Sequence, residues 1–249
     1  MLMKKGIVLY HAYKNRVKSQ FDELKEYLLE MDYLLQEKKS HFMQECKPKE
    51  QNSSFHKKDF IIELIDEEYF KYEYSYAKVL YNSSFVTAYS LFESFFLKLC
   101  EHAKYQKNIK LNVNDVSGKG IKQYKLFLNK VVGVDFTPFQ TEWQEIRDYN
   151  KIRNYIVHNR SSIIKDSNRE LQQQEDYFLV KKSIFLKIEN EKFGTFYIDD
   201  KNYIIDFCAL VNNFLLQMLE SIWKLEWKTL GFFNKRRYCI VKRVVTLTP

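Results

Sequence analysis

The chain has 249 residues, a formal net charge of +8, and 45% hydrophobic residues, enough for a substantial core in one large or two small domains. Only 6 glycines and 3 prolines are present, which argues against a turn-rich β-sandwich or barrel and favours long helices. The positive charge is compatible with an anionic partner such as nucleic acid, but it does not identify one.

The four cysteines do not form a metal-binding pattern. Cys46, Cys100, Cys208 and Cys239 are scattered, with no C-x-x-C pair and no zinc-finger spacing to a histidine. We therefore expect no metal site and no cofactor. Cys100 and Cys208 lie within apolar helical patterns, which predicts that they are small core residues.

The apolar segments favour a cytoplasmic protein. The N-terminal apolar run, residues 7–9, is too short for a signal peptide. The most apolar helical pattern, residues 203–228, is interrupted by Asn212, Gln217 and Glu220, so we do not expect it to span a membrane.

Two amphipathic helices are predicted at the N-terminus, over residues 10–43 and 59–80, because apolar residues recur there at steps of three or four. Residues 46–56 between them contain a proline and several polar residues and predict a linker. Together, residues 1–80 would form a helical hairpin that extends a core made by residues 81–228. The second helix carries four tyrosines that either pack between helices or form a platform for nucleic-acid bases: Tyr69, Tyr72, Tyr74 and Tyr76.

The next segment predicts a buried helix followed by a loop. Asn82-Ser83-Ser84 is either a helix cap or a short break, and residues 85–102 then place apolar side chains on one helical face. Glu93 lies at the edge of that face. Residues 104–120 form a polar loop, whose Ser-Gly-Lys-Gly string is too short for a phosphate-binding P-loop. A shorter helix is expected over residues 121–132.

A small β-hairpin interrupts the helical pattern near the C-terminus. Residues 165–176 are polar and predict a mobile loop. Residues 183–188 and 194–198 alternate in polarity and predict two short strands. Residues 203–228 keep the helical period and predict the last long helix. The chain is therefore expected to be a single, mostly α domain with a β-hairpin insertion.

The tail, residues 229–249, is basic and contains no acidic residue. Lys235, Arg236 and Arg237 are its densest cluster, and they are candidates for contacting an RNA backbone. A solvated basic tail that binds nothing is the alternative.

Residues 143–159, W-Q-E-I-R-D-Y-N-K-I-R-N-Y-I-V-H-N, form the most informative stretch of the chain. Thr137-Pro138 predicts the start of its helix. One side of this helix is apolar, and Arg153 lies at the seam between the two sides. The other side carries a guanidinium, two amides and an imidazole, spaced by three, four and four residues: Arg147, Asn150, Asn154 and His158.

These side chains suit a phosphate ester cleaved without a metal ion. Arginine offers a fixed fork of donors for phosphate, and histidine can take and give a proton near neutral pH. Asparagine can orient either group without changing its charge. The alternative is structural, with His158 stabilising the helix C-terminus and the other side chains simply solvated.

The string Arg153-Asn154-Tyr155-Ile156-Val157-His158 resembles the Arg-(four to six residues)-His signature of HEPN-domain proteins, in the form with Asn directly after Arg. The resemblance extends loosely from about Tyr81 to Leu225. It implies an antiparallel helical bundle of HEPN type. It also implies a metal-independent endoribonuclease that leaves 2′,3′-cyclic phosphate and 5′-OH ends, with a role as a toxin or antiviral defence effector.

The resemblance assigns roles to individual residues. Arg153 and His158 would be catalytic, and Asn154 would orient the imidazole or a phosphate oxygen. Arg147 and Asn150 would support them. Glu93 either pairs with Arg147 or Arg153, as an acidic residue does in many HEPN proteins, or is a solvent-edge carboxylate. Arg160, just past His158, would hold a second phosphate or simply end the helix.

The spacing of the motif separates its arginine from its histidine, and the resemblance implies that a homodimer reunites them. Five residues on a helix separate two side chains by about 140°, so Arg153 and His158 of one chain diverge unless the helix ends between them. The resemblance implies a composite site formed by motif helices of two protomers. RNA is the expected substrate, and an antitoxin or regulatory protein is a further expected partner. The alternatives are a non-catalytic helical module that binds RNA or a protein, and a purely structural scaffold.

Overall fold

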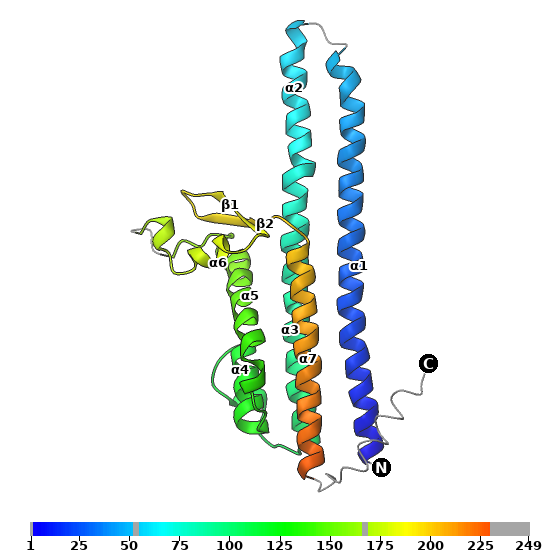
Figure 1. Ribbon diagram of the computed structural model, residues 1–249, viewed down its shortest axis with the longest axis vertical. Coiled ribbons are helices and arrows are strands. Elements are labelled where there is room, and N and C mark those ends of the chain that lie inside the picture. Colours follow the sequence, from blue (N-terminus) through cyan, green and yellow to red (C-terminus); the bar gives the residue numbers. More distant parts are fainter. Residues whose placement is uncertain (1, 52–54, 166–168, 230–249) are drawn as a thin grey trace. The chain divides into compact units, whose positions relative to one another are not determined.

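The computed structural model describes residues 2–51, 55–165 and 169–229, and the side chains of residues 8–46, 62–165 and 169–224 (Figure 1). The chain is mostly helical with one two-stranded antiparallel sheet, as the sequence predicts. The tail residues Lys235, Arg236 and Arg237 lie outside the described residues.

The first N-terminal helix is longer than predicted, and the second begins earlier and ends earlier than predicted. Helix α1 spans Leu2–Gln51, and α2 begins at Phe55 and ends at Phe70. The predicted linker over residues 46–56 is therefore wrong at both of its ends. Cys46 is buried, which shows that the apolar side of α1 continues past the predicted helix end.

The second and third predicted helices follow one another without a loop. A π-helical segment, Lys71–Ser75, connects α2 to α3, which spans Tyr76–Gln106. The predicted cap or break at residues 82–84 does not occur. Ser83 Oγ donates a hydrogen bond to the carbonyl of Leu80, and Thr87 Oγ1 donates one to the carbonyl of Ser83. The hydroxyls thus bond to the preceding turn of the helix, and do not end it.

The loop after α3 contains a 3-10 turn, Val113–Asp115. Helix α4 spans Ile121–Leu126 and continues as a π-helical segment, Phe127–Val132, which ends at the left-handed Gly133 with φ 85°. This matches the helix predicted over residues 121–132. A 3-10 turn, Thr137–Phe139, then leads into α5.

Helix α5 spans Gln140–His158. After it come a 3-10 turn, Leu171–Gln173, and the short helix α6, Tyr177–Lys181. The predicted mobile loop over residues 165–176 is wrong in part, because Gln174 and Asp176 are buried and hydrogen-bonded.

The hairpin and the last helix agree with the sequence. Strand β1, Leu186–Asn190, pairs with β2, Thr195–Ile198, with Leu186 opposite Ile198 and Ile188 opposite Phe196. Helix α7 spans Asn202–Thr229. Its side chains Phe207, Cys208 and Phe214 are buried, as the apolar period predicts.

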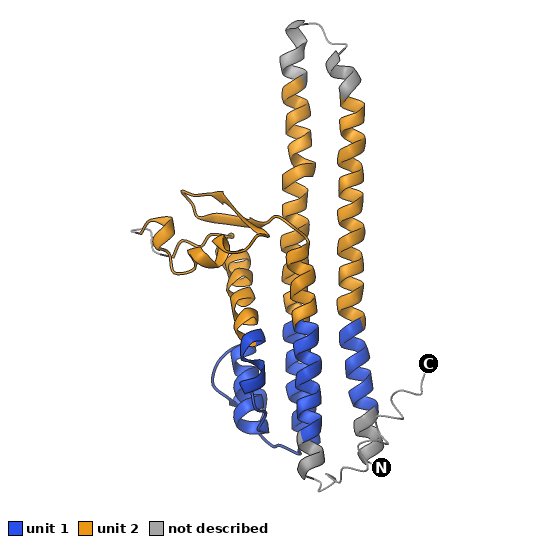
Figure 2. Cartoon of the chain, viewed as in Figure 1, with its two compact units in different colours: residues 1–18, 92–142, 211–249 blue, residues 19–91, 143–210 orange. Residues whose placement is uncertain are grey.

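The chain forms two compact units, which Figure 2 shows in different colours. Unit 1 comprises residues 1–18, 92–142 and 211–249, and unit 2 comprises residues 19–91 and 143–210. Each unit has its own buried aromatic cluster. The cluster of unit 1 includes Phe92, Phe96, Phe139 and Phe214, and that of unit 2 includes Phe85, Tyr89, Tyr149, Tyr203 and Phe207. The predicted division into residues 1–80, 81–228 and 229–249 stays a prediction.

A buried carboxylate connects three helices within unit 2. Asp32 of α1 accepts hydrogen bonds from the hydroxyl of Tyr81 on α3 and from the ammonium of Lys201, which directly precedes α7. Asp32 is 4% exposed, so the carboxylate is shielded from water, whereas the Lys201 side chain is about one-third exposed. Because it fixes three segments at one point, it sets where α1 packs in this unit.

Candidate functional site

The local sequence sets the start and the buried side of α5. Asp135 Oδ1 accepts a hydrogen bond from the backbone N–H of Thr137, and Pro138 occupies the first turn, where no N–H is needed. From residue 143 onward the helix belongs to unit 2. Ile146 and Ile152 of the predicted apolar side are buried, whereas Tyr149 and Ile156 of that side are half-buried. Trp143 and Tyr155 are also buried.

Two residues of the predicted polar side, together with Arg153 at its seam, form a connected network with Tyr89 of α3. Arg153 Nη1 donates a hydrogen bond of 3.1 Å to Asn154 Oδ1, and Asn154 Nδ2 donates one of 3.4 Å to Asn150 Oδ1. Asn150 Nδ2 in turn donates to the hydroxyl of Tyr89. The structure therefore brings together Asn150 and Asn154, which spacing placed on one side of the helix, and Arg153, which the resemblance singled out.

The guanidinium of Arg153 also lies over the Tyr89 ring, with Cζ 5.5 Å from the ring centroid. This distance is within the range of a cation–π interaction. The Arg153 Nε is shielded from solvent and makes no hydrogen bond to any described residue. A buried donor without an acceptor is costly. The second Nη also forms no hydrogen bond to a described residue, but it is not shielded, so an anionic ligand can bind there.

His158 is the last residue of α5, and its side chain is exposed. Among the described residues it forms no hydrogen bond or ion pair, with Arg153 or with any other side chain. Arg147 is likewise exposed and forms neither within the described part of the chain. The site of one chain thus presents a held arginine and an unconstrained histidine.

The turn after His158 uses its polar groups to end the helix. The backbone N–H groups of Asn159 and Ser161 both donate to the carbonyl of Tyr155, at 3.0 and 2.9 Å. Arg160 and Ser161 adopt left-handed φ values of 52° and 60°, which are costly for residues other than glycine. Arg160 is exposed, and its predicted contact with RNA stays a prediction.

The strained turn is fixed by the hairpin. Ser162 Oγ donates a hydrogen bond of 2.7 Å to the carbonyl of Phe193 and accepts one from the N–H of Ile164. The N–H of Phe196 donates to the carbonyl of Ser161. Both serines therefore contribute to the turn that ends the helix and to its contact with the hairpin.

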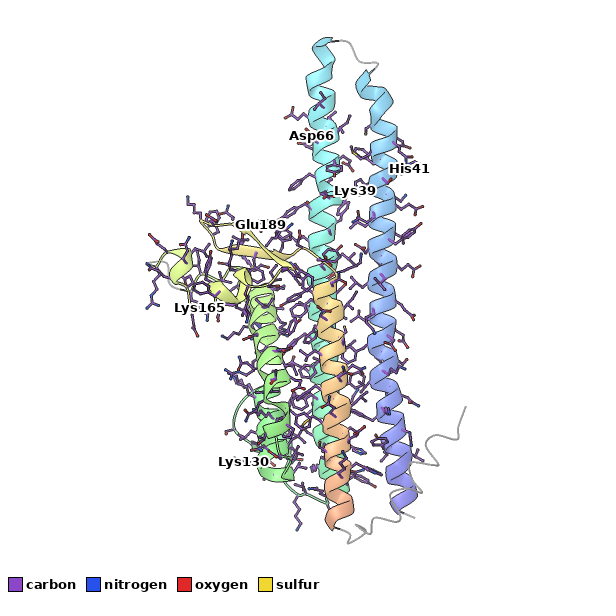
Figure 3. All side chains as sticks on the ribbon, viewed as in Figure 1. Lys39, His41, Asp66, Lys130, Lys165 and Glu189 are labelled. Carbon is purple, nitrogen blue, oxygen red and sulfur yellow. The ribbon has the colours of Figure 1, made fainter. Side chains whose placement is uncertain are left out.

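Sequence reasoning missed a buried ionic cluster at the C-terminal half of α5. Asp176, which is 3% exposed, accepts hydrogen bonds from Lys151 Nζ at 2.7 Å, Tyr155 Oη at 2.6 Å and Lys165 Nζ at 3.0 Å. Figure 3 labels Lys165, which lies in the segment after α5. Asp176 occurs in a polar stretch without periodicity, so no signal in the sequence indicates that it is buried.

The hydrogen bonds decide the ionisation of this cluster. Burial favours the neutral form of Asp176, but the donors Lys151, Tyr155 and Lys165 outweigh it and lower the pKa of the carboxyl group to about 2. Burial, together with the hydrogen bond to Asp176, raises the pKa of Tyr155 to about 12. At neutral pH, Asp176 is therefore a carboxylate and Tyr155 is a neutral donor.

Glu93 belongs to unit 1, whereas Arg147 and Arg153 belong to unit 2, so its pairing with either arginine stays a prediction. Within unit 1, Glu93 lies beside Gly120, at the start of α4. A Cβ at Gly120 would lie 3.1 Å from Glu93 Oε1, and its φ of 57° also favours glycine. A carboxylate at a helix N-terminus is favoured by the helix dipole.

The tyrosines of the second helix contact neighbouring rings within unit 2. Tyr72 lies 5.9 Å from Phe42 and 5.5 Å from Tyr76, measured between ring centroids. Tyr74 contacts Tyr197 of β2 at 4.9 Å. These contacts favour helix packing over a platform for nucleic-acid bases.

A second ionic contact holds the hairpin to the same helix. The hydroxyl of Tyr74 and the ammonium of Lys78 both donate to the carboxylate of Glu189 on β1 (Figure 3). The hydrogen bonds from Lys78 and Tyr74 outweigh burial and lower the pKa of Glu189. The β-hairpin is therefore anchored at the π-helical segment.

Other features do not define a second site. One open surface hollow of about 550 Å³ is lined by residues that include Glu101 and Asn112. A second, of about 790 Å³, is lined by residues that include Ser162 and Phe193. Arg153 lines neither hollow. Within the described ranges, no three His, Cys, Asp or Glu side chains lie close enough to hold a metal ion.

The membrane prediction is not decided by the structure. In the part of α7 that is described, residues 202–224 are long enough and apolar enough to cross a membrane. Within the protein, 44% of the apolar 18-residue stretch of this segment is buried. Soluble core helices pass the same test. We predicted from Asn212, Gln217 and Glu220 that this helix does not span a membrane, and this stays a prediction. The cytoplasmic location also stays a prediction.

Comparisons with protein-family models, with curated proteins and with solved structures found no match to this chain.

Proposed function

We propose that the chain is a metal-independent endoribonuclease of HEPN type. The observation that carries the proposal is the Arg153 guanidinium, which is held by Tyr89 and Asn154 and whose second Nη forms no hydrogen bond to a described residue. A fixed guanidinium with free donors suits a phosphate oxygen. His158, exposed at the end of the same helix, supplies an imidazole that can act as a general acid or base.

The chemistry needs no metal ion, because RNA contains its own nucleophile. The 2′-OH loses its proton and attacks the neighbouring phosphorus, and the bond to the 5′-oxygen breaks. His158 takes or delivers a proton in this transfer. Arg153 stabilises the charge that develops on the non-bridging oxygens, and Arg147 assists it. The products are a 2′,3′-cyclic phosphate and a 5′-OH.

A homodimer completes the site in this proposal. Arg153 and His158 of one chain make no contact with each other, and five helical residues separate their directions by about 140°. Two α5 helices related by a two-fold axis would place the arginine of one protomer beside the histidine of its partner. Arg160, with the basic residues Lys235, Arg236 and Arg237, would contact the RNA backbone beyond the cleaved bond.

The biological role that fits is that of a toxin or antiviral effector, restrained until a trigger arrives. An antitoxin or regulatory protein is the partner expected for such an enzyme. Both statements extend from the resemblance of the Arg153–His158 motif.

One observation favours the alternative, a non-catalytic module that binds RNA or a protein. In the described part of the chain, no neighbouring group orients the His158 imidazole, whereas a catalytic histidine is usually held by a hydrogen bond. In the proposed homodimer, the partner protomer would supply that hydrogen bond. A dimer that orients His158 in this way therefore favours the ribonuclease, and a chain without it favours the binding module.

The chemistry of the substrate provides the test. An RNA oligonucleotide should be cut, and the same sequence with 2′-deoxyribose throughout should stay intact but still bind. Mass spectrometry of the fragments should find 2′,3′-cyclic phosphate ends. Cleavage of the deoxy strand, or fragments with 5′-phosphate ends, would contradict the proposal, because neither arises from attack by a 2′-OH.

A further inference from the structure

Tyr89 is fully buried, yet it carries a hydroxyl where phenylalanine would fill the same space. Its ring stacks on Phe207 with centroids 5.7 Å apart and an interplanar angle of 16°. A buried hydroxyl is unfavourable unless it is hydrogen-bonded. The amide of Asn150 supplies that bond.

The same tyrosine contacts both ends of the polar network on α5. Its hydroxyl accepts from Asn150, and its ring lies beneath the guanidinium of Arg153. Between these two points, Arg153 donates to Asn154 and Asn154 donates to Asn150. The contacts therefore form a closed ring: Tyr89, Arg153, Asn154, Asn150 and Tyr89 again.

A closed ring restricts the guanidinium more than any one of its contacts does. The Tyr89 ring restricts where the Arg153 guanidinium lies, and Asn154 restricts its rotation by accepting a hydrogen bond from Nη1. The second Nη, which forms no hydrogen bond to a described residue and is not among the shielded atoms, then remains for a ligand. Arginine side chains lose much rotamer freedom when they bind, so a guanidinium oriented beforehand gains affinity and rate.

We infer that Tyr89 is a positioning residue: it orients Arg153, directly through its ring and indirectly through Asn150, to receive a phosphate oxygen. This inference rests on the proposed ribonuclease function for its catalytic consequence. Its structural part, the orientation of the guanidinium, can be measured independently of any activity.

Two pairs of variants separate the ring, the hydroxyl and general stability. Tyr89→Leu removes the aromatic face, and Phe85→Leu is its matched control. Phe85 is also fully buried on α3 and contacts Tyr149, Tyr203 and Phe207, but it lies outside the ring around Arg153. Tyr89→Phe removes only the hydroxyl, and Tyr149→Phe is the control for that change.

The first readout is the rate at which the Arg153 Nε–Hε proton exchanges with solvent, measured by NMR. The signal of this proton is the one that disappears in Arg153→Lys. In the wild type this proton should exchange slowly, because the atom is shielded. Tyr89→Leu should accelerate the exchange by about tenfold or more, and Phe85→Leu should not. Circular dichroism and thermal unfolding establish that each variant is folded.

The second readout is RNA cleavage. Tyr89→Leu should lower kcat by about 10²-fold with little change in KM, because a misplaced group loses its interaction with the transition state. Tyr89→Phe should lower kcat by about tenfold, since it breaks one of the four contacts. Phe85→Leu and Tyr149→Phe should cleave as the wild type does.

The outcomes distinguish the inference from the function on which it rests. A folded Tyr89→Leu whose Arg153 Nε–Hε exchanges as slowly as in the wild type would overturn the positioning role. If Tyr89→Leu does not fold, the same exchange measurement on Tyr89→Phe decides: exchange as slow as in the wild type would overturn the positioning role. If no variant and no wild-type protein cuts RNA, but exchange accelerates only in the Tyr89 variants, the ribonuclease is refuted and the positioning role stands.

Discussion

The hydroxyl of Tyr155, on the buried side of α5, donates a hydrogen bond of 2.6 Å to the carboxylate of Asp176. The backbone carbonyl of the same tyrosine accepts the two N–H groups that end the helix just after His158. Tyr155 therefore connects a buried charge to the geometry of the helix end, where the proposed proton-transfer group is located.

Replacing Asp176 tests how much this cluster contributes to stability. Asp176→Ala leaves the Tyr155 hydroxyl without its acceptor and removes the partner of two lysines. We expect the free energy of unfolding, from urea denaturation, to fall by about 3 kcal/mol. Glu175→Ala is the control, because that side chain is exposed and its ion pair with Lys165 should contribute less than about 1 kcal/mol. Equal effects at both positions would contradict the interpretation.

The same carboxylate predicts a loss of stability in acid. Its folded pKa, about 2, is lower than the ordinary value of 3.8 because hydrogen bonds outweigh burial. A group with a depressed folded pKa contributes fully above the unfolded pKa, and that contribution disappears as the pH falls through the folded pKa. The free energy of unfolding of the wild type should exceed that of Asp176→Asn at about pH 5, and this difference should shrink by about 2 kcal/mol by about pH 2. A difference that stays constant over this range would refute the assignment.

The turn after α5 predicts opposite effects at two adjacent serines. Ser161 has a φ of 60° and no hydroxyl contact among the described residues, so Ser161→Gly should relieve strain and stabilise the protein by about 0.5–1 kcal/mol. Ser162→Gly removes the hydroxyl that binds Phe193 and Ile164, and should destabilise it by about 1–2 kcal/mol. Thermal unfolding measures both. Destabilisation by Ser161→Gly would show that the left-handed turn stores no strain.

The periodic parts of the fold were predictable, and the exceptions have identifiable causes. Apolar spacing predicted α5 and α7, and alternation predicted the β1–β2 hairpin. Serines at 83 and 84 suggested a break, but hydroxyl bonds to the preceding turn leave a helix intact. Such bonds depend on side-chain rotamers, which composition does not specify.

The site was predictable only within one helix. Steps of three and four residues placed Asn150 and Asn154 together, as the structure has them. The contacts of Tyr89 and Asp176 join segments far apart in the sequence, and no local pattern indicates such pairings. A single sequence could therefore identify the polar side of α5, but not the residues that hold it.

The composite site predicts complementation between inactive variants. If Arg153 acts with His158 of the partner protomer, Arg153→Ala and His158→Ala should each be inactive alone, and a refolded equimolar mixture should regain activity. Statistical pairing gives about a quarter of the wild-type activity, because half of the dimers are mixed and each has one intact site. No recovery from a mixture that forms mixed dimers would contradict the composite site. Recovery should also disappear when the mixture is diluted until the dimers dissociate.

The most direct test of the ribonuclease proposal is cleavage of a mixed RNA pool by the purified protein in EDTA, with His158→Ala and Arg153→Ala alongside. The account predicts cutting by the wild type without a metal ion and none by either variant, although both stay folded and bind RNA. Cutting that His158→Ala retains, or wild-type cutting that EDTA abolishes, would contradict it.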